Sequence, residues 1–346
     1  MVRRKTLADF RHLATETRGS RRKPINNPLR SVSAPVSLSG EMPSVEAFNV
    51  AVRETGWSTE IRQLDLHARP VRFRACSTQR LTLLQVEFPN RAHQQGDPPE
   101  GRVTFGVPTV PQRDFKVRGM PVSSESITCF ADGLESVSEP EFNAYTVSVD
   151  SALMERSAQR LRPAGDSFQP ETRLVDNHAL ASIRLVLATA MELAGNADIA
   201  ADTRAALLRN FEAQLPEMIG SLWATAEPRR NQANAGRRHD VIRRTAGSLS
   251  INAIRQYQIE DLCEAAACSQ RTLERSFRER FGITPKQYLN RVRLAGVHKA
   301  LANPEEERSI GDLAAHWGFW HHSHFAANYR AMYGELPSQT AQRARG

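Results

Sequence analysis

Residues 259–282 read IEDLCEAAACSQRTLERSFRERFG, and residues 310–334 read IGDLAAHWGFWHHSHFAANYRAMYG. Each stretch contains a short helix pattern, a turn, and a longer helix pattern that ends in an aromatic residue and a glycine. The longer helix of the first copy carries Leu273, Phe277 and Phe281 at every fourth position. The repetition predicts two helix-turn-helix units in tandem, and the second helix of such a unit enters the major groove of DNA.

The second copy repeats the fourfold spacing with Phe325, Tyr329 and Tyr333. Ser269 stands where it can cap the longer helix of the first copy. The shorter helices are expected to bury the apolar residues on one face, which are Ile259, Leu262, Ala265 and Ala266 in the first copy and Ile310, Leu313 and Ala314 in the second. The stretch is therefore expected to form a helical domain with two small cores.

The excess positive charge of the chain lies in this region. Residues 229–346 contain 19 Lys and Arg against 11 Asp and Glu, while the remainder holds 27 of each and is neutral. A surface that displaces counterions from phosphates needs such a bias.

The longer helix of the first copy presents a charged face opposite its apolar face. An arginine can bind guanine with two hydrogen bonds, and a glutamate can accept one from cytosine. A solvated charged face is also the ordinary state of an amphipathic helix, so the DNA-binding hypothesis depends on the duplication, the charge bias and the turn residues together. The residues of this helix expected to contact DNA are Gln270, Arg271, Glu274, Arg275 and Arg278.

A longer series of residues carries a family likeness. It comprises Ile259-Glu260-Asp261-Leu262, Ser269, Arg271 to Phe277, Phe281-Gly282, Thr284-Pro285, Tyr288-Leu289, Arg291 to Leu294, Ala300-Leu301, Ile310 to Ala314, Gly318-Phe319, Phe325, Tyr329, Tyr333-Gly334 and Pro337. In this order the region resembles the DNA-binding domain of the AraC/XylS family of bacterial transcription regulators. The resemblance implies a connecting helix that places two recognition helices in successive major-groove turns, roughly 34 Å apart. It also implies that Arg271, Glu274 and Arg275 read bases.

The second unit departs from the family pattern. His321 occupies a position where a small capping residue is common, and Ala327 stands where the family often carries arginine. The polar residues left to contact DNA are His321, His322, Ser323 and His324. We expect base discrimination to come mainly from the first unit, whereas the second unit contacts the DNA backbone and recognises DNA shape. Zinc binding by the histidines is the alternative, but the sequence offers no fourth ligand at a recognisable spacing, and no metal or other cofactor is predicted.

The N-terminal half shows short strand patterns between turn residues. Expected strands include residues 64–66, 71–74, 81–88, 103–107, 127–130 and 145–149. This spacing is typical of an antiparallel barrel or jelly roll. We predict an α+β chain with a disordered basic tail at 1–40, a sensor and dimerisation domain at 41–226 that is β-rich to 150 and helical from 151, a linker at 227–238, and the DNA-binding domain at 239–346.

Several other features limit the functional class. Cys76, Cys129, Cys263 and Cys268 form no CxxC motif, which favours a reducing cytoplasm over an extracellular framework; a redox pair of Cys263 and Cys268 is the alternative. Arg184 and Glu192 interrupt the apolar run 179–194, so no membrane span is expected. No phosphate loop, GxSxG elbow or paired-carboxylate motif indicates an enzyme.

The prediction is therefore a bacterial cytoplasmic transcription regulator, associated with the nucleoid and controlled by a small-molecule effector of unknown identity. Its expected partners are double-stranded promoter DNA, RNA polymerase and a second copy of the chain. Residues 271–277 and 282–286 are similar to those of regulators of ethanolamine-type catabolic operons, which implies a catabolic or metabolic target. The alternatives are a nucleoid-type protein that binds DNA without sequence choice, and an enzyme carrying a DNA-binding domain.

Overall fold

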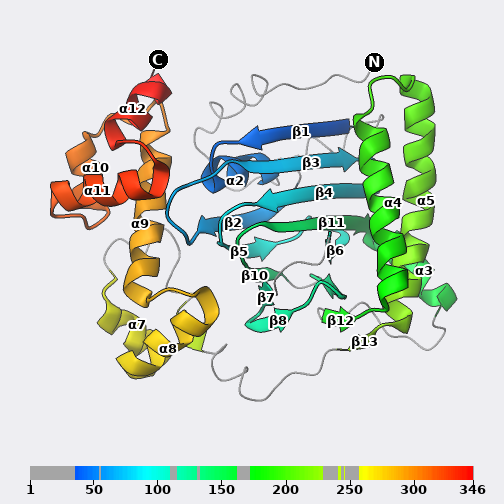
Figure 1. Ribbon diagram of the computed structural model, residues 1–346, viewed down its shortest axis with the longest axis horizontal. Helices are drawn as coiled ribbons and strands as arrows, with labels where there is room; N and C mark the ends of the chain where they lie inside the picture. Colours follow the sequence, from blue (N-terminus) through cyan, green and yellow to red (C-terminus); the bar gives the residue numbers. More distant parts are fainter. Residues whose placement is uncertain are drawn as a thin grey trace.

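A computed structural model describes residues 36–53, 56–109, 115–130, 133–161, 172–228, 241–242, 245 and 257–345. Figure 1 shows a β-sandwich with a pair of long helices, α4 and α5, at one end and a group of short helices, α7–α12, at the other. Residues 1–35 of the predicted tail at 1–40, and most of the predicted linker, lie outside the described residues. The fold is α+β, as the sequence indicates.

The sandwich consists of two antiparallel sheets. The large sheet has the strand order β1-β3-β4-β11-β6-β9-β12-β13, and the small sheet has the order β2-β5-β10-β7-β8. The strands are β1 (Val36–Met42), β2 (Ser58–Gln63), β3 (Val71–Ser77), β4 (Leu81–Phe88), β5 (Ala92–Asp97), β6 (Arg102–Pro108), β7 (Phe115–Val117), β8 (Met120–Val122), β9 (Ser126–Cys129), β10 (Leu134–Ser138), β11 (Phe142–Asp150), β12 (Thr172–Leu174) and β13 (Glu227–Pro228).

Phenylalanines fill much of the space between the sheets. Phe48, on helix α2 (Val45–Arg53), lies 5.7 Å from both Phe73 and Phe88, measured between ring centroids. Phe115 of the small sheet meets Phe142 of the large sheet edge to face at 5.1 Å. Side chains from both sheets and α2 therefore form one shared core, which joins the sheets into a single domain.

Some sequence predictions for this domain are wrong. Residues 64–66 form a loop after β2, because Leu64 leaves the sandwich and packs into the core of the first helix-turn-helix unit. The predicted tail reaches residue 40, yet β1 begins at Val36 and pairs with β3 along its whole length. The region after 150 is mainly helical, but it also contains β12, which extends the large sheet beside β9.

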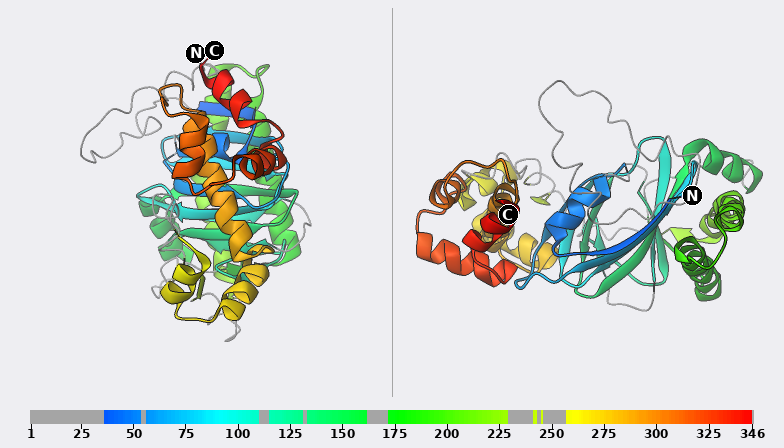
Figure 2. Two further views of the ribbon diagram at one scale, coloured as in Figure 1. Left: turned by 90° about the vertical axis from the view of Figure 1, so that its left-hand side faces the viewer. Right: turned by 90° about the horizontal axis from the view of Figure 1, so that it is seen from above.

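Three helices lie beside the large sheet on its outer side (Figure 2). They are α3 (Ser151–Leu161), α4 (Asn177–Gly195) and α5 (Ala201–Thr225). Asp176 caps α4 by accepting hydrogen bonds from the backbone of His178 and Ala179. Phe105 of β6 packs edge to face on Trp223 of α5, with ring centroids 5.6 Å apart. The apolar faces of these helices are thus largely buried against the sheet.

Helix α4 corrects the expectation about membrane spans. Among the described residues it alone is long and apolar enough to cross a membrane, judged by length and composition only. Arg184 donates hydrogen bonds to the carbonyls of Pro108 and Ser124, and Ile183 and Leu187 are buried in the core against the large sheet. A helix that covers the core of a folded domain can be as long and as apolar as a membrane-spanning helix.

The C-terminal helices follow the predicted order. They are α7 (Ile259–Ala266), α8 (Gln270–Phe281), α9 (Pro285–Leu301), α10 (Ile310–His316), α11 (His322–Tyr333) and α12 (Pro337–Arg345). Each of the two units has its own apolar cluster, and both clusters draw on the connecting helix α9. The predicted burial of Ala265 is wrong: its side chain is exposed, while Leu262 and Ala266 form the buried face of α7.

One face of the small sheet supports the C-terminal domain. The register aligns Arg62 of β2 with His93 of β5, His93 with Val137 of β10, and Val137 with Lys116 of β7. Cross-strand partners share a face of a sheet, so these four side chains form one row. Each contacts or packs with the C-terminal domain, so the first helix-turn-helix unit is docked on this row.

Candidate nucleic-acid interface

The first recognition helix, α8, has defined ends and one fully buried side. Ser269 caps its start by accepting a hydrogen bond from the backbone of Thr272 (3.3 Å), and Gly282 ends it with φ +74°. That backbone angle favours glycine, because a Cβ atom crowds the left-handed conformation. Leu273 and Phe277 are completely buried. The pattern of aromatic residues and caps in the sequence thus fixes which side of α8 faces outward.

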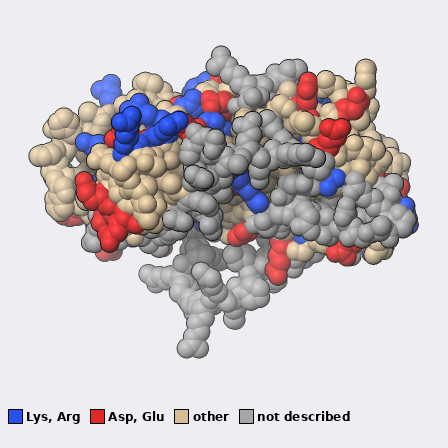
Figure 3. Space-filling view, turned by 90° about the horizontal axis from the view of Figure 1, so that it is seen from below, with Lys and Arg blue, Asp and Glu red and all other residues tan. Residues whose placement is uncertain are grey.

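The outward side of α8 carries the residues predicted to contact DNA. Arg271, Arg275 and Arg278 are exposed, as is Gln270, while Glu274 is half-buried. Gln270 donates a hydrogen bond to Glu274 (3.3 Å). Figure 3 shows Lys and Arg side chains gathered at the end of the molecule that the C-terminal helices form, beside a group of acidic side chains. The structure therefore brings the five predicted residues of the first unit together on one accessible helix face.

Arg275 already has a charged neighbour on its own helix. Its guanidinium lies 3.0 Å from the Glu279 carboxylate, one turn further along α8, and its side chain is 73 % exposed. An exposed pair of this kind contributes little stability. Exchanging that carboxylate for a guanine edge or a phosphate therefore costs little, and Arg275 can turn toward DNA.

The second recognition helix, α11, is less well equipped. Its N-cap residue, His321, makes no capping hydrogen bond with its side chain. His322, Ser323 and His324 are exposed around its first turn, together with His321, and Ala327 is exposed one turn later. The rings of His321 and His324 lie 6.3 Å apart, edge to face. The four predicted residues are thus adjacent on the surface, and none provides the planar two-pronged donor of an arginine.

Sequence reasoning missed Trp320, which immediately precedes this group. Its side chain is 77 % exposed, the largest exposure among the large apolar side chains of the described residues. It lies in the turn between α10 and α11, after Gly318, whose φ is +82°. The available signal was an aromatic residue in a turn, next to polar groove candidates. An indole offers an apolar face and one N–H donor, a combination suited to a sugar-phosphate backbone.

Helix α9 connects the two units. Thr284 and Gln287 form a capping box at its start, and Pro285 occupies its first turn. Near its other end, Gly296 lies beneath the ring of Trp317, which follows α10. A Cβ atom at Gly296 would lie only 2.2 Å from that ring. The absence of a side chain at this position therefore allows α10 to pack closely on α9.

A buried polar cluster joins the first unit to the small sheet. The hydroxyl of Tyr288, on α9, accepts a hydrogen bond from Arg62 (2.8 Å) and lies 2.8 Å from Nδ1 of His93. Arg280, at the end of α8, forms an ion pair with Glu135 of β10. Arg62, His93 and Arg280 are almost completely buried. Docking has therefore removed several charged and polar groups from water, and their contacts with one another offset that cost only in part, since Nε2 of His93 and Nε of Arg280 are buried without a hydrogen-bond partner.

The protonation of this cluster follows from its contacts. Burial, together with the nearby positive charges of Arg62 and Arg280, holds the pKa of His93 well below its usual range, so the ring is neutral. Because Arg62 donates to the Tyr288 hydroxyl, that hydroxyl is left to donate to Nδ1 of His93. The ring then carries its proton on Nε2, which faces Glu135 at 3.4 Å. Burial also raises the pKa of Tyr288, which keeps this hydroxyl protonated.

Two alternatives from the sequence, a redox pair of cysteines and a metal site, receive little support. Cys263 and Cys268 are both free and half-buried, and burial raises the pKa of each thiol, which disfavours the reactive thiolate. Among the residues that the structure describes, no three His, Cys, Asp or Glu side chains are grouped as metal ligands would be.

Comparison with known proteins agrees with this geometry. A helix-turn-helix domain family model matches residues 262–343. A XylDLEGF operon transcriptional activator of Pseudomonas putida is 39 % identical over 93 residues, which cover 27 % of this chain and 28 % of that protein. The HTH-type transcriptional activator RhaR of an Enterobacter species is 28 % identical over 176 residues, or 51 % of this chain and 59 % of that one. The match thus spans less than a third of the P. putida activator.

Among solved structures, a probable AraC family transcriptional regulator from Rhodopseudomonas palustris is 33 % identical to this chain. That match covers 31 % of this chain and 99 % of the other, with a TM-score of 0.30.

Proposed function

Because the chain belongs to the AraC/XylS family of transcription regulators through its C-terminal region, we propose that it binds promoter DNA sequence-specifically and controls transcription. One observation carries the proposal: the two recognition helices, joined by α9, leave eight of their nine predicted contact residues exposed and the ninth, Glu274, half-buried. The family is one of regulators rather than enzymes. We assign the DNA contacts to Gln270, Arg271, Glu274, Arg275, Arg278, His321, His322, Ser323 and His324.

The first unit is proposed to read bases. Replacing Arg271 or Arg275 with alanine is expected to weaken binding to the cognate site by about 1 to 3 kcal/mol, because each loses a bidentate contact with guanine. The fold is expected to stay intact, since both side chains are exposed. The measurement is a titration of each full-length variant against a site selected in vitro from random DNA by the parent protein. Parental affinity in both variants would contradict the assignment.

The second unit is proposed to contact the DNA backbone and to recognise DNA shape, without reading individual bases. Alanine at His322 or His324 is expected to lower affinity for all sequences by a similar factor, since neither residue is a strong bidentate reader. Repeating the in vitro selection with each variant tests this expectation. The selected sequence should match that of the parent at every position, and a changed base preference under the second unit would refute the idea.

The N-terminal domain is proposed to sense a small-molecule effector and to mediate dimerisation. Leu185 of α4 is 69 % exposed on the outer side of the helical layer, where a second copy could cover it. Binding at a promoter implies contact with RNA polymerase and a place in the bacterial cytoplasm, at the nucleoid. The proposed target is a catabolic or metabolic operon.

A nucleoid-type protein without sequence choice is separated from this proposal by a ratio of affinities. A specific regulator exceeds its own background by about 10³-fold or more at one salt concentration. The parent protein should therefore prefer its selected site over random DNA by at least that factor. Equal affinities, with no sequence enriched by selection, would favour the nucleoid-type alternative.

A further inference from the structure

The sensor domain contacts the last turn of the first recognition helix. Lys116 of β7 donates a hydrogen bond to the carbonyl oxygen of Glu279. The guanidinium of the next residue, Arg280, forms its ion pair with Glu135. Phe281, the final residue of α8, packs its ring edge to face on His93 at 4.9 Å. The C-terminal turn of α8 is therefore held by three strands of the small sheet.

The sensor domain also contacts the last turn of the second recognition helix. The loop between β2 and β3, residues 64–70, reaches the end of α11. There the backbone N–H groups of His67 and Ala68 donate to the carbonyl oxygens of Ala331 (2.9 Å) and Met332 (2.7 Å). Tyr333, the final residue of α11, donates a hydrogen bond to Glu46 of α2 (3.2 Å). Each recognition helix is thus attached to the sensor by its last turn.

These contacts satisfy a general need of helices. The last four carbonyl groups of a helix have no partner within it, and the C-terminus carries partial negative charge. Gly334 supplies an N–H to one such carbonyl of α11, that of Arg330, and the loop supplies donors to the next two. In α8, the ammonium group of Lys116 serves one of the corresponding carbonyls. The sensor therefore contributes to the C-terminal capping of both helices.

The attachment leaves the residues predicted to contact DNA accessible, including Arg278, which lies in the last turn of α8 but is exposed. The predicted DNA contacts of α8 lie between Gln270 and Arg278, and those of α11 lie between His321 and His324, at its start. Recognition helices contact base edges mainly with their N-terminal residues. The docked arrangement is therefore compatible with DNA binding, and it fixes where the two reading ends lie relative to each other.

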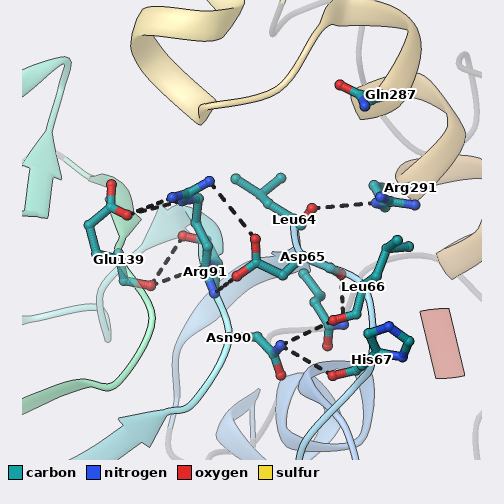
Figure 4. Close-up of polar contacts among 12 residues, drawn as sticks. Leu64, Asp65, Leu66, His67, Asn90, Arg91, Glu139, Gln287 and Arg291 are labelled. Atoms are coloured by element: carbon teal, nitrogen blue, oxygen red, sulfur yellow. Dashed lines mark hydrogen bonds and ion pairs between the residues drawn. The ribbon is translucent and has the colours of Figure 1, made fainter. Parts of the chain in front are cut away.

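The loop reaches both units, and the buried side chain of Asn90 holds its middle (Figure 4). The amide of Asn90 donates to the carbonyls of Leu66 (3.4 Å) and His67 (3.2 Å), and its oxygen accepts from the backbone of Arg69 (3.0 Å). His67 has a φ of +59°, a conformation that a residue with a side chain adopts only when its surroundings impose it. Asn90 is 5 % exposed.

The same loop also grips the first unit. The side chain of Leu64 is 1 % exposed within the apolar cluster of that unit, and its carbonyl accepts a hydrogen bond from Arg291 of α9 (3.4 Å; Figure 4). Arg91, the neighbour of Asn90, donates from its backbone to the Asp65 carboxylate (2.7 Å). A single loop seven residues long thus contacts the first unit through its start and the second unit through its middle.

We propose that the sensor domain sets the spacing of the two recognition helices on DNA, and that Asn90 is the positioning residue that shapes the loop for this task. The inference rests on the proposed DNA-binding function and extends it: the sensor forms part of the reading apparatus in addition to controlling it. A promoter whose two major-groove elements are separated by the wrong number of base pairs is rejected because the sensor resists movement of α11 relative to α8.

The experiment uses the full chain with Asn90→Ala and a series of DNA duplexes. The parent duplex is the site selected in vitro by the unaltered protein, and the others carry one or two base pairs inserted between the bases read by the first unit and the segment whose shape the second unit recognises. The unaltered protein is expected to lose affinity steeply across the series. We call the affinity for the parent duplex divided by the affinity for an inserted duplex the spacing ratio. Asn90→Ala is expected to lower the spacing ratio by at least about fivefold, a typical coupling between linked sites. Faster hydrogen exchange is expected at His67 and Ala68.

A matched control separates positioning from general destabilisation. Thr82, at the opposite end of β4, is also buried and bonds to Ser77 (2.9 Å) and Arg102 (2.9 Å) in the same domain. Thr82→Val is expected to lower the melting temperature yet keep the spacing ratio. The inference is overturned if Asn90→Ala keeps the parental ratio, or if Thr82→Val relaxes it equally. Failure of the unaltered protein to enrich any sequence would instead overturn the proposed function.

Discussion

Replacing Glu135 with alanine is expected to lower the free energy of unfolding of the docked protein by about 3 to 5 kcal/mol, because the change leaves a buried guanidinium without its counterion. Arg280 is 4 % exposed, and its carboxylate partner is 23 % exposed. Burial lowers the pKa of Arg280, which reflects the same cost of keeping the charge away from water. The change also removes the carboxylate that faces Nε2 of His93. Urea denaturation of the full chain, followed by circular dichroism, measures the loss.

Two further variants make this expectation specific. Adding Arg280→Met to Glu135→Ala is expected to recover much of the lost stability, since an apolar side chain of similar length needs no counterion. Glu217→Ala breaks the pair of Glu217 with Arg160, whose side chains are 54 % and 72 % exposed, and is expected to change stability very little. An equal loss from Glu135→Ala and Glu217→Ala would show that burial of the interdomain pair has no special energetic weight.

Replacing Gly296 with alanine is expected to destabilise the second unit by about 1 to 3 kcal/mol, the usual cost of forcing extra volume into a packed core. Within a helix the same change is ordinarily stabilising by about 0.5 to 1 kcal/mol, so the expected sign is reversed. The reason is the Trp317 ring: three of its carbon atoms lie within 2.4 Å of the position that the new Cβ atom would take. Trp317 is 5 % exposed and has little room to move.

Gly311, in the first turn of α10, provides the comparison for this change. A Cβ atom there would find its nearest neighbour at 3.4 Å, in the flexible ring of His322. Gly311→Ala is therefore expected to be neutral or slightly stabilising. Thermal unfolding of both variants decides the matter: a Gly296→Ala protein as stable as the parent would mean that Trp317 repacks without cost.

The C-terminal fold could be predicted from the sequence because its signals are local. Ser269 and Gly282 mark the two ends of α8 through their own local preferences. The spacing of Leu273, Phe277 and Phe281 defines one face of the same helix. No partner from elsewhere in the chain is needed to interpret these signals. The same holds for the outward position of Arg271 and its neighbours, which follows from helical geometry once the buried face is known.

The N-terminal domain was harder to predict because its elements depend on distant partners. The alternation in Leu64, Asp65 and Leu66 fits a strand, but the burial of Leu64 comes from residues some two hundred positions later. Strand β5 (Ala92–Asp97) is polar at several positions, one of which holds His93, a buried residue whose partner is Tyr288. A single sequence carries no sign of such pairings, and the interdomain cluster could therefore not be predicted.

Trp320 was missed for a different reason. Aromatic residues usually contribute to a core, and its neighbour Phe319 does pack against the cluster of the second unit. Only the structure separates the two adjacent aromatic residues into one that is partly buried and one that points into solvent.

The attachment of both recognition helices by their last turns has a consequence for how this protein can change. Base preference is assigned to the first two turns of α8, and the DNA contacts of α11 are assigned to its first turn, whereas the sensor contacts Glu279, Arg280, Ala331 and Met332. Substitutions that retarget the protein to a new operator can therefore accumulate without weakening its response machinery. Conversely, a different sensor can be grafted onto these helices provided that it supplies the two backbone donors, the ammonium donor and the two carboxylates that contact them here.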